Sequence, residues 1–387
     1  MPPSLTPEMK AGASGQVGEL IRAAGRLADS FRFDNADDSG ATFPAREMVY
    51  LTQEGILQAA LPLNRGGAGM GVEAGSQIHL LHLLKEIGRA NLSLGRVYEG
   101  HVNALQLIHV YGNAEQQASA VVDCLSGKLF AVWNTDSPDP VCLSSDGEGS
   151  WRLNGSKAFA SAAGWADRPL VTAERVSAGR QMCLLKKEEM TAEIDFSSWH
   201  PVGMEASGSY EINLSGTRLS ESALIGSAGE YYTAPLFVGG SIRTSAVLLG
   251  GAEALFQHLR SYLRCFRQTL RPLQQFRMAR IYAEVVSGRG WLQYAAAAAE
   301  TGLYAHADRP AAQRMNFAAN ATRVAIEDIC SQVIRFVSES VGARGLMPPF
   351  RFGPIIKDLT MFLRQPNPDE CLLEAGRYLL ESEDPNV

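Results

Sequence analysis

The chain has 387 residues, 46% of them hydrophobic and 20% charged, which is ordinary for a globular protein with two or three domains. Its net charge of −6 argues against nucleic acid or an anionic membrane surface as a partner. Six cysteines stand singly and no stretch approaches the roughly 18 consecutive apolar residues of a membrane span, so we expect no metal site, no disulfide framework, no membrane anchor and a reducing, cytoplasmic location.

The predicted elements fall into three blocks along the chain. From about 16 to 125, apolar residues recur at spacings of three and four, which predicts helices. From 127 to about 228, short apolar runs alternate with Gly, Asp, Asn and Ser at intervals of roughly ten residues, which is typical of antiparallel strands in a barrel or a sandwich. Long helical patterns return from about 231. This order argues against a Rossmann sheet and predicts an α+β, mostly α chain with an N-terminal all-α domain (1–126), a middle β-barrel domain (127–229) and a C-terminal α-helical bundle (230–387).

Two prolines interrupt the last helical block close to the end of the sequence. In "FLRQPNPDECLLEAGRYLL" (362–380), prolines at 366 and 368 remove two backbone donors and push the residue before each of them out of helical geometry. Asp369 and Glu370 then begin a new periodic stretch with its own apolar stripe. Such a break is either a plain corner or a loop that holds something.

Five stretches, by their order and spacing, resemble the acyl-CoA dehydrogenase superfamily over nearly the whole chain. They are "LPLNRGGAGMG", "KEIGRANLSLGRVYEGHVNALQLIHVYGNAEQQ", "FAVWNTDSP" followed by "WRLNGSKAFASAAGWADRPLVTA", "GMEASGSYEINLSG", and "VGARG" with the later "KDL". The resemblance implies an N-terminal helical domain, a middle β-barrel and a C-terminal four-helix bundle. It also implies a bound FAD, and a homodimer or homotetramer assembled through the C-terminal helices.

The resemblance places the flavin against two strands. The predicted flavin-binding residues of these strands are Trp133, Asn134, Thr135, Phe159, Ala160 and Ser161. In relatives the second strand carries Trp-x-Thr, whose aromatic ring covers the flavin and whose hydroxyl reaches N5, so Phe159 and Ser161 are conservative replacements. A flavin needs such an apolar wall and a few hydroxyl or backbone partners because these groups set its redox potential. The alternative is that they are ordinary core aromatics and a strand serine.

The pyrophosphate of a dinucleotide needs guanidinium groups or helix N-termini. In relatives an Arg-x-Phe-Gly segment of a neighbouring subunit supplies an arginine. "RQTLRPLQQF" sits at that place without the Phe-Gly, so Arg267 or Arg271 is the candidate. Gly342 and Gly345 match the family's Gly-Gly-x-Gly run, but Glu339 stands where relatives carry Gln, and a carboxylate there would repel the pyrophosphate. The alternative is a set of solvated helical arginines and a surface glutamate.

Dehydrogenases of the superfamily carry, at the break after the "KDL" run, a Glu that removes the α-proton of a thioester. Such a base works in a dry pocket that raises its pKa. Here Gln365 and Pro366 stand at that place, and Ile242 occupies the other position that some relatives use. The remaining candidates are Asp369, Glu370 and Arg243. The two carboxylates alternatively stabilise the N-terminus of the last helix, and the arginine alternatively forms a salt bridge.

Three further signals bear on the reaction. Dehydrogenases carry a Gly-rich turn after the first flavin strand, whereas this chain has "TDSPDPVCLSS", which removes close backbone approach to a substrate. His79 and His82 share a helix face but lack the carboxylates of a metal site, and "GGAGMG" is not a dinucleotide-binding fingerprint. We expect His101 to have a packing or capping role.

Three functions follow as hypotheses. The first is an acyl-CoA dehydrogenase-like flavoprotein oxidoreductase that acts on the CH–CH group of a CoA or carrier-protein thioester, with FAD as electron acceptor and an electron-transfer flavoprotein as partner. The second is a flavin-dependent monooxygenase of the same fold, which uses reduced flavin from a flavin reductase together with oxygen and needs no α-proton base. The third is a binding or scaffold protein without turnover.

Overall fold

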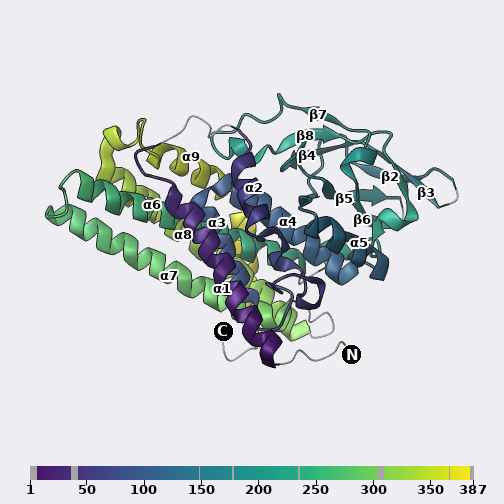
Figure 1. The fold of residues 1–387 in the computed structure, drawn as a ribbon, viewed down its shortest axis with the longest axis horizontal. Helices are drawn as coiled ribbons and strands as arrows, with labels where there is room; N and C mark the ends of the chain where they lie inside the picture. Colours follow the sequence, from purple (N-terminus) through teal and green to yellow (C-terminus); the bar gives the residue numbers. More distant parts are fainter. Residues whose placement is uncertain are drawn as a thin grey trace.

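The N-terminal third of the chain forms helices, as predicted. They are α1 (Pro7–Ser30), α2 (Ala45–Gln53), α3 (Gln77–Ala90), α4 (Leu92–Tyr111) and α5 (Ala114–Leu125), with the 3-10 turns η2 (Leu57–Ala60) and η3 (Leu63–Arg65) between α2 and α3. The computed structural model describes residues 7–35, 42–147, 149–176, 178–233, 236–303, 309–365 and 367–383 (Figure 1). A reciprocal capping box between Asn113 and Gln116 begins α5.

Helix α4 is buried along most of its length and joins the helical and β-rich parts of the chain. Its His101 is fully buried, accepts a hydrogen bond from Phe130 N at 3.1 Å through Nδ1, and donates to Leu57 O at 2.9 Å through Nε2. Burial lowers the pKa of His101 to about 4, so the ring is neutral at physiological pH. This is the packing and capping role that the sequence predicts.

The middle of the chain forms strands that divide into two sheets. The strands are β1 (Phe130–Trp133), β2 (Cys142–Ser145), β3 (Ser150–Asn154), β4 (Ser156–Ala160), β5 (Arg168–Arg175), β6 (Gly179–Leu184), β7 (Glu193–Asp195), β8 (Tyr210–Asn213), β9 (Arg218–Ser220) and β10 (Leu224–Ile225). One sheet has the order β10-β6-β5-β2-β3-β9, with β1 also paired to β5, and the other has the order β4-β8-β7. Short 3-10 turns η4 (Lys187–Glu189), η5 (Glu205–Ser207), η6 (Glu221–Ala223) and η7 (Glu230–Tyr232) connect them.

Not all of these strands are antiparallel, in contrast to the prediction. β1 and β2 both run parallel to β5, with Phe130 opposite Arg168 and Cys142 opposite Glu174. The two strands therefore occupy successive parts of one edge of β5, separated by the excursion 134–141. Turn residues in the sequence indicate where a strand ends but not which strand it pairs with. The parallel direction of β1 and β2 could therefore not be predicted from the sequence.

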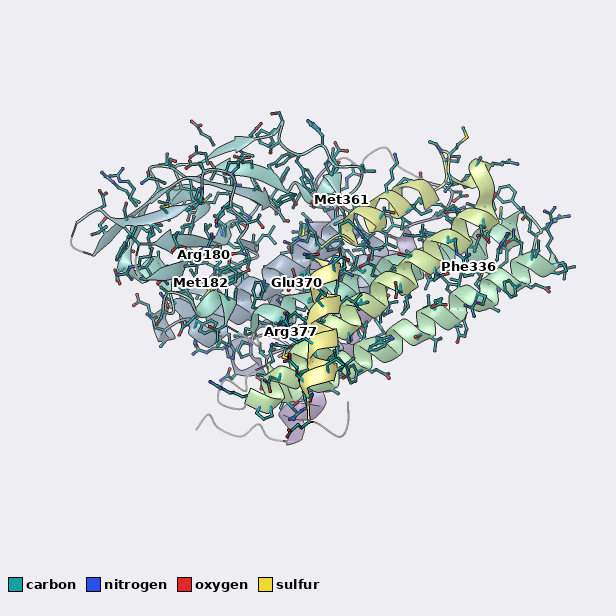
Figure 2. All side chains as sticks on the ribbon, turned by 180° about the vertical axis from the view of Figure 1, so that it is seen from behind. Arg180, Met182, Phe336, Met361, Glu370 and Arg377 are labelled. Atoms are coloured by element: carbon teal, nitrogen blue, oxygen red, sulfur yellow. The ribbon has the colours of Figure 1, made fainter. Side chains whose placement is uncertain are left out.

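The C-terminal part returns to helices. They are α6 (Leu236–Cys265), α7 (Pro272–Gly302), α8 (Arg309–Gly345), α9 (Phe352–Phe362) and α10 (Pro368–Glu381). The long helices α6, α7 and α8 lie side by side on the other side of α4 from the strands, and α10 runs along α8 (Figures 1 and 2). The predicted fold class, mostly α with a β-rich middle, is confirmed.

Close contact between α3 and α6 joins the first and last helical blocks into one core. A Cβ at Gly88 would lie 2.4 Å from the carbonyl oxygen of Val247, and a Cβ at Gly250 would lie 2.2 Å from that of Lys85. Only glycine permits backbones to approach this closely. In the described part of the chain no helix is both long and apolar enough to cross a membrane, and no three His, Cys, Asp or Glu residues cluster as metal ligands.

Candidate active site

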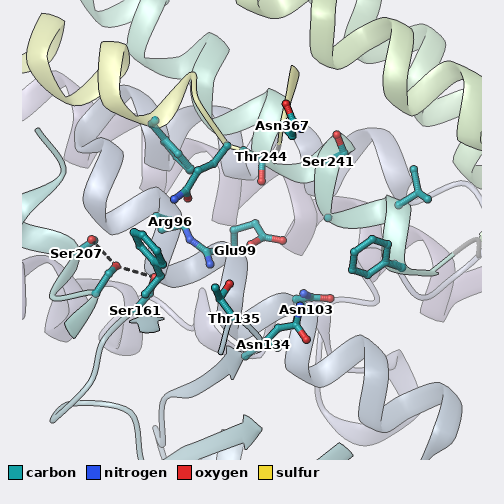
Figure 3. Close-up of a pocket in the computed structure, with 18 of the residues that line it drawn as sticks. Arg96, Glu99, Asn103, Asn134, Thr135, Ser161, Ser207, Ser241, Thr244 and Asn367 are labelled. Carbon is teal, nitrogen blue, oxygen red and sulfur yellow. Dashed lines mark hydrogen bonds and ion pairs between the residues drawn. The ribbon is translucent and has the colours of Figure 1, made fainter. Parts of the chain in front are cut away.

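A cavity of about 560 Å³ lies where the two helical blocks meet the strands. Its size is within the range of small-molecule and cofactor sites. Its lining comes from α4, from the end of β1, from β4, from the segment that leads into β8, from α6 and from the α9–α10 corner (Figure 3). The cavity is therefore lined by side chains from the N-terminal helices, the strand region and the C-terminal helices.

Four of the six predicted flavin-strand residues line this cavity: Asn134, Thr135, Phe159 and Ser161. The other two, Trp133 and Ala160, are buried and do not line it. Trp133 instead supports the second strand from behind, because its Nε1 donates to Ser161 O at 2.9 Å. The structure thus brings together residues that are about 25 positions apart in sequence, as the resemblance implies.

A β-bulge in β4 directs the second strand toward the cavity. The pairing of β4 with β8 shifts register between Lys157 and Ala160, and Phe159 between them has φ +52°. An extra residue of this kind bends a strand and re-aims its side chains. The Phe159 ring is 47% exposed and packs edge-on against Trp199, with ring centroids 5.8 Å apart. The cavity therefore has an aromatic wall with one uncovered ring.

A chain of three hydroxyls fixes the direction in which Ser161 can hydrogen-bond. Ser207 Oγ donates to the carbonyl of Met204 at 2.8 Å, which uses its only proton. Ser209 must then donate to Ser207, and Ser161 to Ser209, each at 2.8 Å (Figure 3). With every proton placed in this way, Ser161 presents only acceptor lone pairs to the cavity.

A buried lysine fixes the exit of the first flavin strand. Lys157 Nζ donates to Asn134 O at 2.8 Å and to Thr172 Oγ1 at 3.1 Å, and pairs with Asp136 Oδ1 at 2.6 Å. Arg180 pairs with the same carboxylate. Burial lowers the pKa of Lys157, whereas Asp136 opposes that shift. The cavity-lining residues 134 and 135 are therefore held by charges behind them.

A charged cluster from α4 and α6 forms another part of the lining. Glu99 Oε1 accepts from Arg243 Nε at 3.0 Å, and Glu99 Oε2 accepts from Arg96 Nη1 at 2.8 Å. Arg243 also donates to Gln106 Oε1 at 2.6 Å and is buried behind the cavity surface, so it forms the salt bridge considered as its alternative role. Arg96 and Glu99 were not predicted, although the available signal was that they are the two carboxylate or guanidinium side chains of a helix rich in apolar residues.

The predicted helix break forms one wall of the cavity. Gln365 lines it, and so does Glu370, which lies in the first turn of α10 at the end nearer Met361 (Figure 2). Glu370 is exposed. Asp369 is exposed as well and does not line the cavity, and Pro366 lies outside the described residues.

The residues predicted to hold a pyrophosphate lie elsewhere. Arg267 and Arg271 are exposed in the connection between α6 and α7, and Gly342 forms a kink near the end of α8, where φ is +60° and ψ is −171°. Neither these residues nor Gly345 line the cavity. Within one chain the structure does not bring them to the predicted flavin strands, so their role at a pyrophosphate stays a prediction.

The chain is similar to known proteins in both sequence and fold. Residues 23–128 match the family model "Acyl-CoA dehydrogenase, N-terminal domain". The "Putative acyl-CoA dehydrogenase YdbM" of Bacillus subtilis (strain 168) is 24% identical over 224 residues, which are 54% of this chain and 57% of that protein, so the match spans little more than half of the relative.

Two solved structures share the fold over nearly the whole chain. The dibenzothiophene monooxygenase TdsC of Paenibacillus sp. A11-2, solved with FMN and indole, has a TM-score of 0.83 at 18% identity and covers 93% of this chain and 96% of its own. The butyryl-CoA dehydrogenase of Megasphaera elsdenii has a TM-score of 0.80 at 16% identity and covers 98% of this chain and 100% of its own. Residues 23–128 therefore resemble the N-terminal domain of acyl-CoA dehydrogenases, and the chain as a whole has the fold of these two solved structures.

Proposed function

We propose that this chain is a flavin-dependent monooxygenase that binds reduced flavin in the 560 Å³ cavity. The observation that carries the proposal is the hydroxyl chain from Ser161 to Met204, which leaves Ser161 as an acceptor. By resemblance Ser161 is the residue that reaches flavin N5. Reduced flavin has a hydrogen on N5 and oxidised flavin has a lone pair there, so an acceptor favours the reduced form.

The residues present fit a flavin ring. Phe159 and Trp199 provide an apolar wall, and the Ser161 and Thr135 hydroxyls lie in the same lining. Ser241 Oγ, also in the lining, is buried and has no hydrogen-bond partner among the described residues, which is the state expected of a group that meets a ligand. TdsC was solved with FMN, which supports a flavin in this fold. We propose FAD, as the resemblance implies, with Arg267 or Arg271 of a second subunit near its pyrophosphate.

Among the described residues, the lining lacks a carboxylate suited to remove an α-proton. Glu99 uses both oxygens in ion pairs, Glu374 pairs with Arg377, Gln365 is neutral, and Glu370 is exposed rather than held in a dry environment. When bound here, a reduced flavin would supply the two electrons for the reduction of molecular oxygen, with one oxygen atom entering the substrate and the other leaving as water. The residues of this chain would exclude bulk solvent, orient the substrate against the flavin strands and hold the N5 hydrogen through Ser161.

A second candidate is the dehydrogenase on acyl thioesters, favoured by one observation. Glu370 lines the cavity from the first turn of α10, five residues beyond Gln365, so a carboxylate is within the site although the loop position lacks one. In this case the substrate is a CoA or carrier-protein thioester, and an electron-transfer flavoprotein accepts the electrons. The monooxygenase instead requires a flavin reductase as partner.

The surface supports a homodimer or homotetramer. Large apolar side chains are exposed along two C-terminal helices: Leu273, Phe276 and Tyr282 on α7, and Leu372, Leu373, Leu379 and Leu380 on α10. Exposed apolar surface of this kind is typical of protein interfaces. Light scattering of the full chain at micromolar concentration should give a mass of about twice or four times 41.8 kDa, and a monomeric mass would contradict the proposal.

Anaerobic titration of the full chain with oxidised and with reduced FAD and FMN tests the function. We expect the reduced form to bind at least about tenfold tighter, since the mismatch of a lone pair with an acceptor costs about 1.4 kcal/mol or more. Ser161→Ala should reduce this preference, whereas the matched control Ser220→Ala, an exposed serine paired with Ser222, should keep it.

The other outcomes separate the candidates. Tighter binding of oxidised flavin, with loss of its visible colour when an acyl thioester is added, would replace the monooxygenase by the dehydrogenase. A preference for reduced flavin that survives Ser161→Ala would remove the observation on which the proposal rests. Failure to bind flavin in either state would leave only the scaffold hypothesis.

A further inference from the structure

The cluster of Arg96, Glu99 and Arg243 has more positive than negative charge. Two guanidinium groups share a single carboxylate, and each of its oxygens already accepts from one of them. Arg243 and Glu99 are buried, with side-chain exposures of 4% and 3%, and Arg96 is 25% exposed at the cavity surface. Burying an excess cation without an anion is costly. The cluster is therefore a place where an additional anion would be stabilised.

Donors of both arginines remain available. Within the described residues Arg96 donates only through Nη1, which leaves most of its five N–H groups. Arg243 Nη2 is buried and has no partner there. Gly240 lines the cavity at this point, and a Cβ on it would lie 3.7 Å from Arg243 Nη2 and 3.9 Å from Glu99 Oε1. The absence of a side chain at 240 thus opens the cluster toward the cavity.

Aromatic side chains stand in the same lining. Tyr231 and Phe237 both contact the cavity and meet edge to face, with centroids 5.6 Å apart. Phe237 is 46% exposed, so its ring is available to a ligand. Tyr231 lies close enough to Glu99, Arg96 and Arg243 for their charges to act on its hydroxyl. An aromatic surface beside guanidinium groups suits a ring that carries an anionic substituent.

We propose that this end of the cavity binds the carboxylate of an aromatic acid, and that the substrate is therefore an aromatic carboxylate rather than an aliphatic acyl chain. The proposal rests on the proposed function, because it names the substrate class of the same site. Two guanidinium groups less one carboxylate leave a single positive charge, which matches a monoanionic carboxylate better than a phosphate dianion. A purely aliphatic tail would instead desolvate the cluster without pairing it.

Carboxylates elsewhere in the lining do not cancel this charge. Glu370 is exposed, and Glu374, whose side chain is 42% exposed, already pairs with Arg377 at 2.6 Å. Charges in contact with solvent are screened within a Debye length of about 8 Å at physiological salt, whereas buried charges are screened far less. The buried cluster therefore dominates the preference of the inner cavity for a ligand charge.

The test uses 2-naphthoate and its neutral amide, 2-naphthamide, as probes of equal shape, with binding to the full chain followed by ligand fluorescence. We expect the carboxylate to bind at least about tenfold tighter than the amide, as for hydrogen bonds to charged groups. Arg96→Met should bring the two affinities within about twofold of each other, and Arg96→Lys should keep part of the difference. Glu99→Gln should act in the opposite direction and tighten 2-naphthoate binding.

The matched control is Arg218→Met, which removes an arginine whose side chain is 71% exposed and outside the cavity lining, and which should leave both affinities unchanged. Equal affinities in the unmodified chain, or a preference that survives Arg96→Met, would overturn the inference. Repeating the titrations with and without flavin separates the two proposals. A carboxylate preference without any flavin binding would overturn the monooxygenase alone, and flavin binding without a preference would overturn the substrate class alone.

Discussion

Arg323 of α8 donates through Nε to the main-chain carbonyl of Gln365, 3.2 Å away, just beyond the end of α9. Its Nη2 donates to the carbonyl of Leu363, and the guanidinium is fully buried. A helix leaves its last carbonyls without partners, and here one side chain satisfies two acceptors at the corner. The break in "FLRQPNPDE" is therefore both a fixed corner and, through Gln365, a wall of the cavity.

Replacing this arginine should destabilise the fold. Arg323→Met leaves two buried carbonyls without donors and removes a cation from Glu327, so we expect the free energy of unfolding to fall by about 3 kcal/mol. Urea unfolding measures it. Arg364→Met is the control, because Arg364 pairs with the same Glu327 but is 60% exposed and should contribute less than about 1 kcal/mol. Equal losses in the two variants would show that the buried carbonyl contacts are unimportant.

Asp358 should make stability depend on pH in a defined direction. It accepts from Met204 N at 2.6 Å, and burial raises its pKa from 3.8 to about 6. Between these values the folded chain holds a proton that the unfolded chain has lost, so the free energy of unfolding falls as pH rises from about 4 to 6. Above pH 6 this contribution, about 3 kcal/mol, is absent.

Asp358→Asn tests that direction, since an amide oxygen can still accept from Met204 and carries no charge to desolvate. We expect the variant to be more stable than the unmodified chain above pH 6 and to lose that advantage near pH 4. Buried His101 and His258, whose pKa values are lowered to about 4, make the free energy of unfolding rise with pH. Both proteins share this contribution, so it cancels when one free energy of unfolding is subtracted from the other. Asp369→Asn, at an exposed carboxylate, is the control. If the difference in the free energy of unfolding between Asp358→Asn and the unmodified chain stays constant from pH 4 to above pH 6, the raised pKa of Asp358 is refuted.

Gln365→Glu should restore the carboxylate that dehydrogenases carry at this loop. Gln365 lines the cavity, so a glutamate there would face the site. We expect gained exchange of the α-protons of a short acyl thioester in deuterated water, measured by NMR, in the presence of flavin. Glu370→Gln in the unmodified background is the companion variant. Loss of a pre-existing exchange in Glu370→Gln would identify Glu370 as a base and support the dehydrogenase.

Lys157→Met should weaken both the fold and flavin binding. The change keeps the apolar stem but removes three contacts of a fully buried ammonium, and leaves Asp136 with Arg180 alone. Removing one partner of a buried charge pair costs on the order of 3 kcal/mol. Since Asn134 loses its support, flavin affinity should fall as well. Lys186→Met, whose ion pair with Glu189 is exposed, should change neither quantity.

The sequence allowed much of the fold to be predicted because the signals are local. Periodic apolar residues predicted the helical blocks, and Gly, Asp, Asn and Ser predicted where strands end. Proline at 366 and 368 predicted the break, since a missing N–H is a covalent property of the residue. The resemblance predicted the two strands that would contact a flavin, and four of the six residues named on them line the cavity.

What only the tertiary structure decided depends on residues far apart in the chain. Glu99 meets Arg243, Ser161 meets Ser209 and Arg323 meets Gln365 across 144, 48 and 42 positions, and β1 and β2 align along one edge of β5. A local pattern gives the type of an element but not its neighbours, which packing of the whole core selects. The direction of the Ser161 hydroxyl and the excess charge beside Glu99 arise from those neighbours. By itself the sequence therefore determined the order and type of the elements and the resemblance that they carry, and tertiary packing decided which hydrogen-bonding groups and which charge face the cavity.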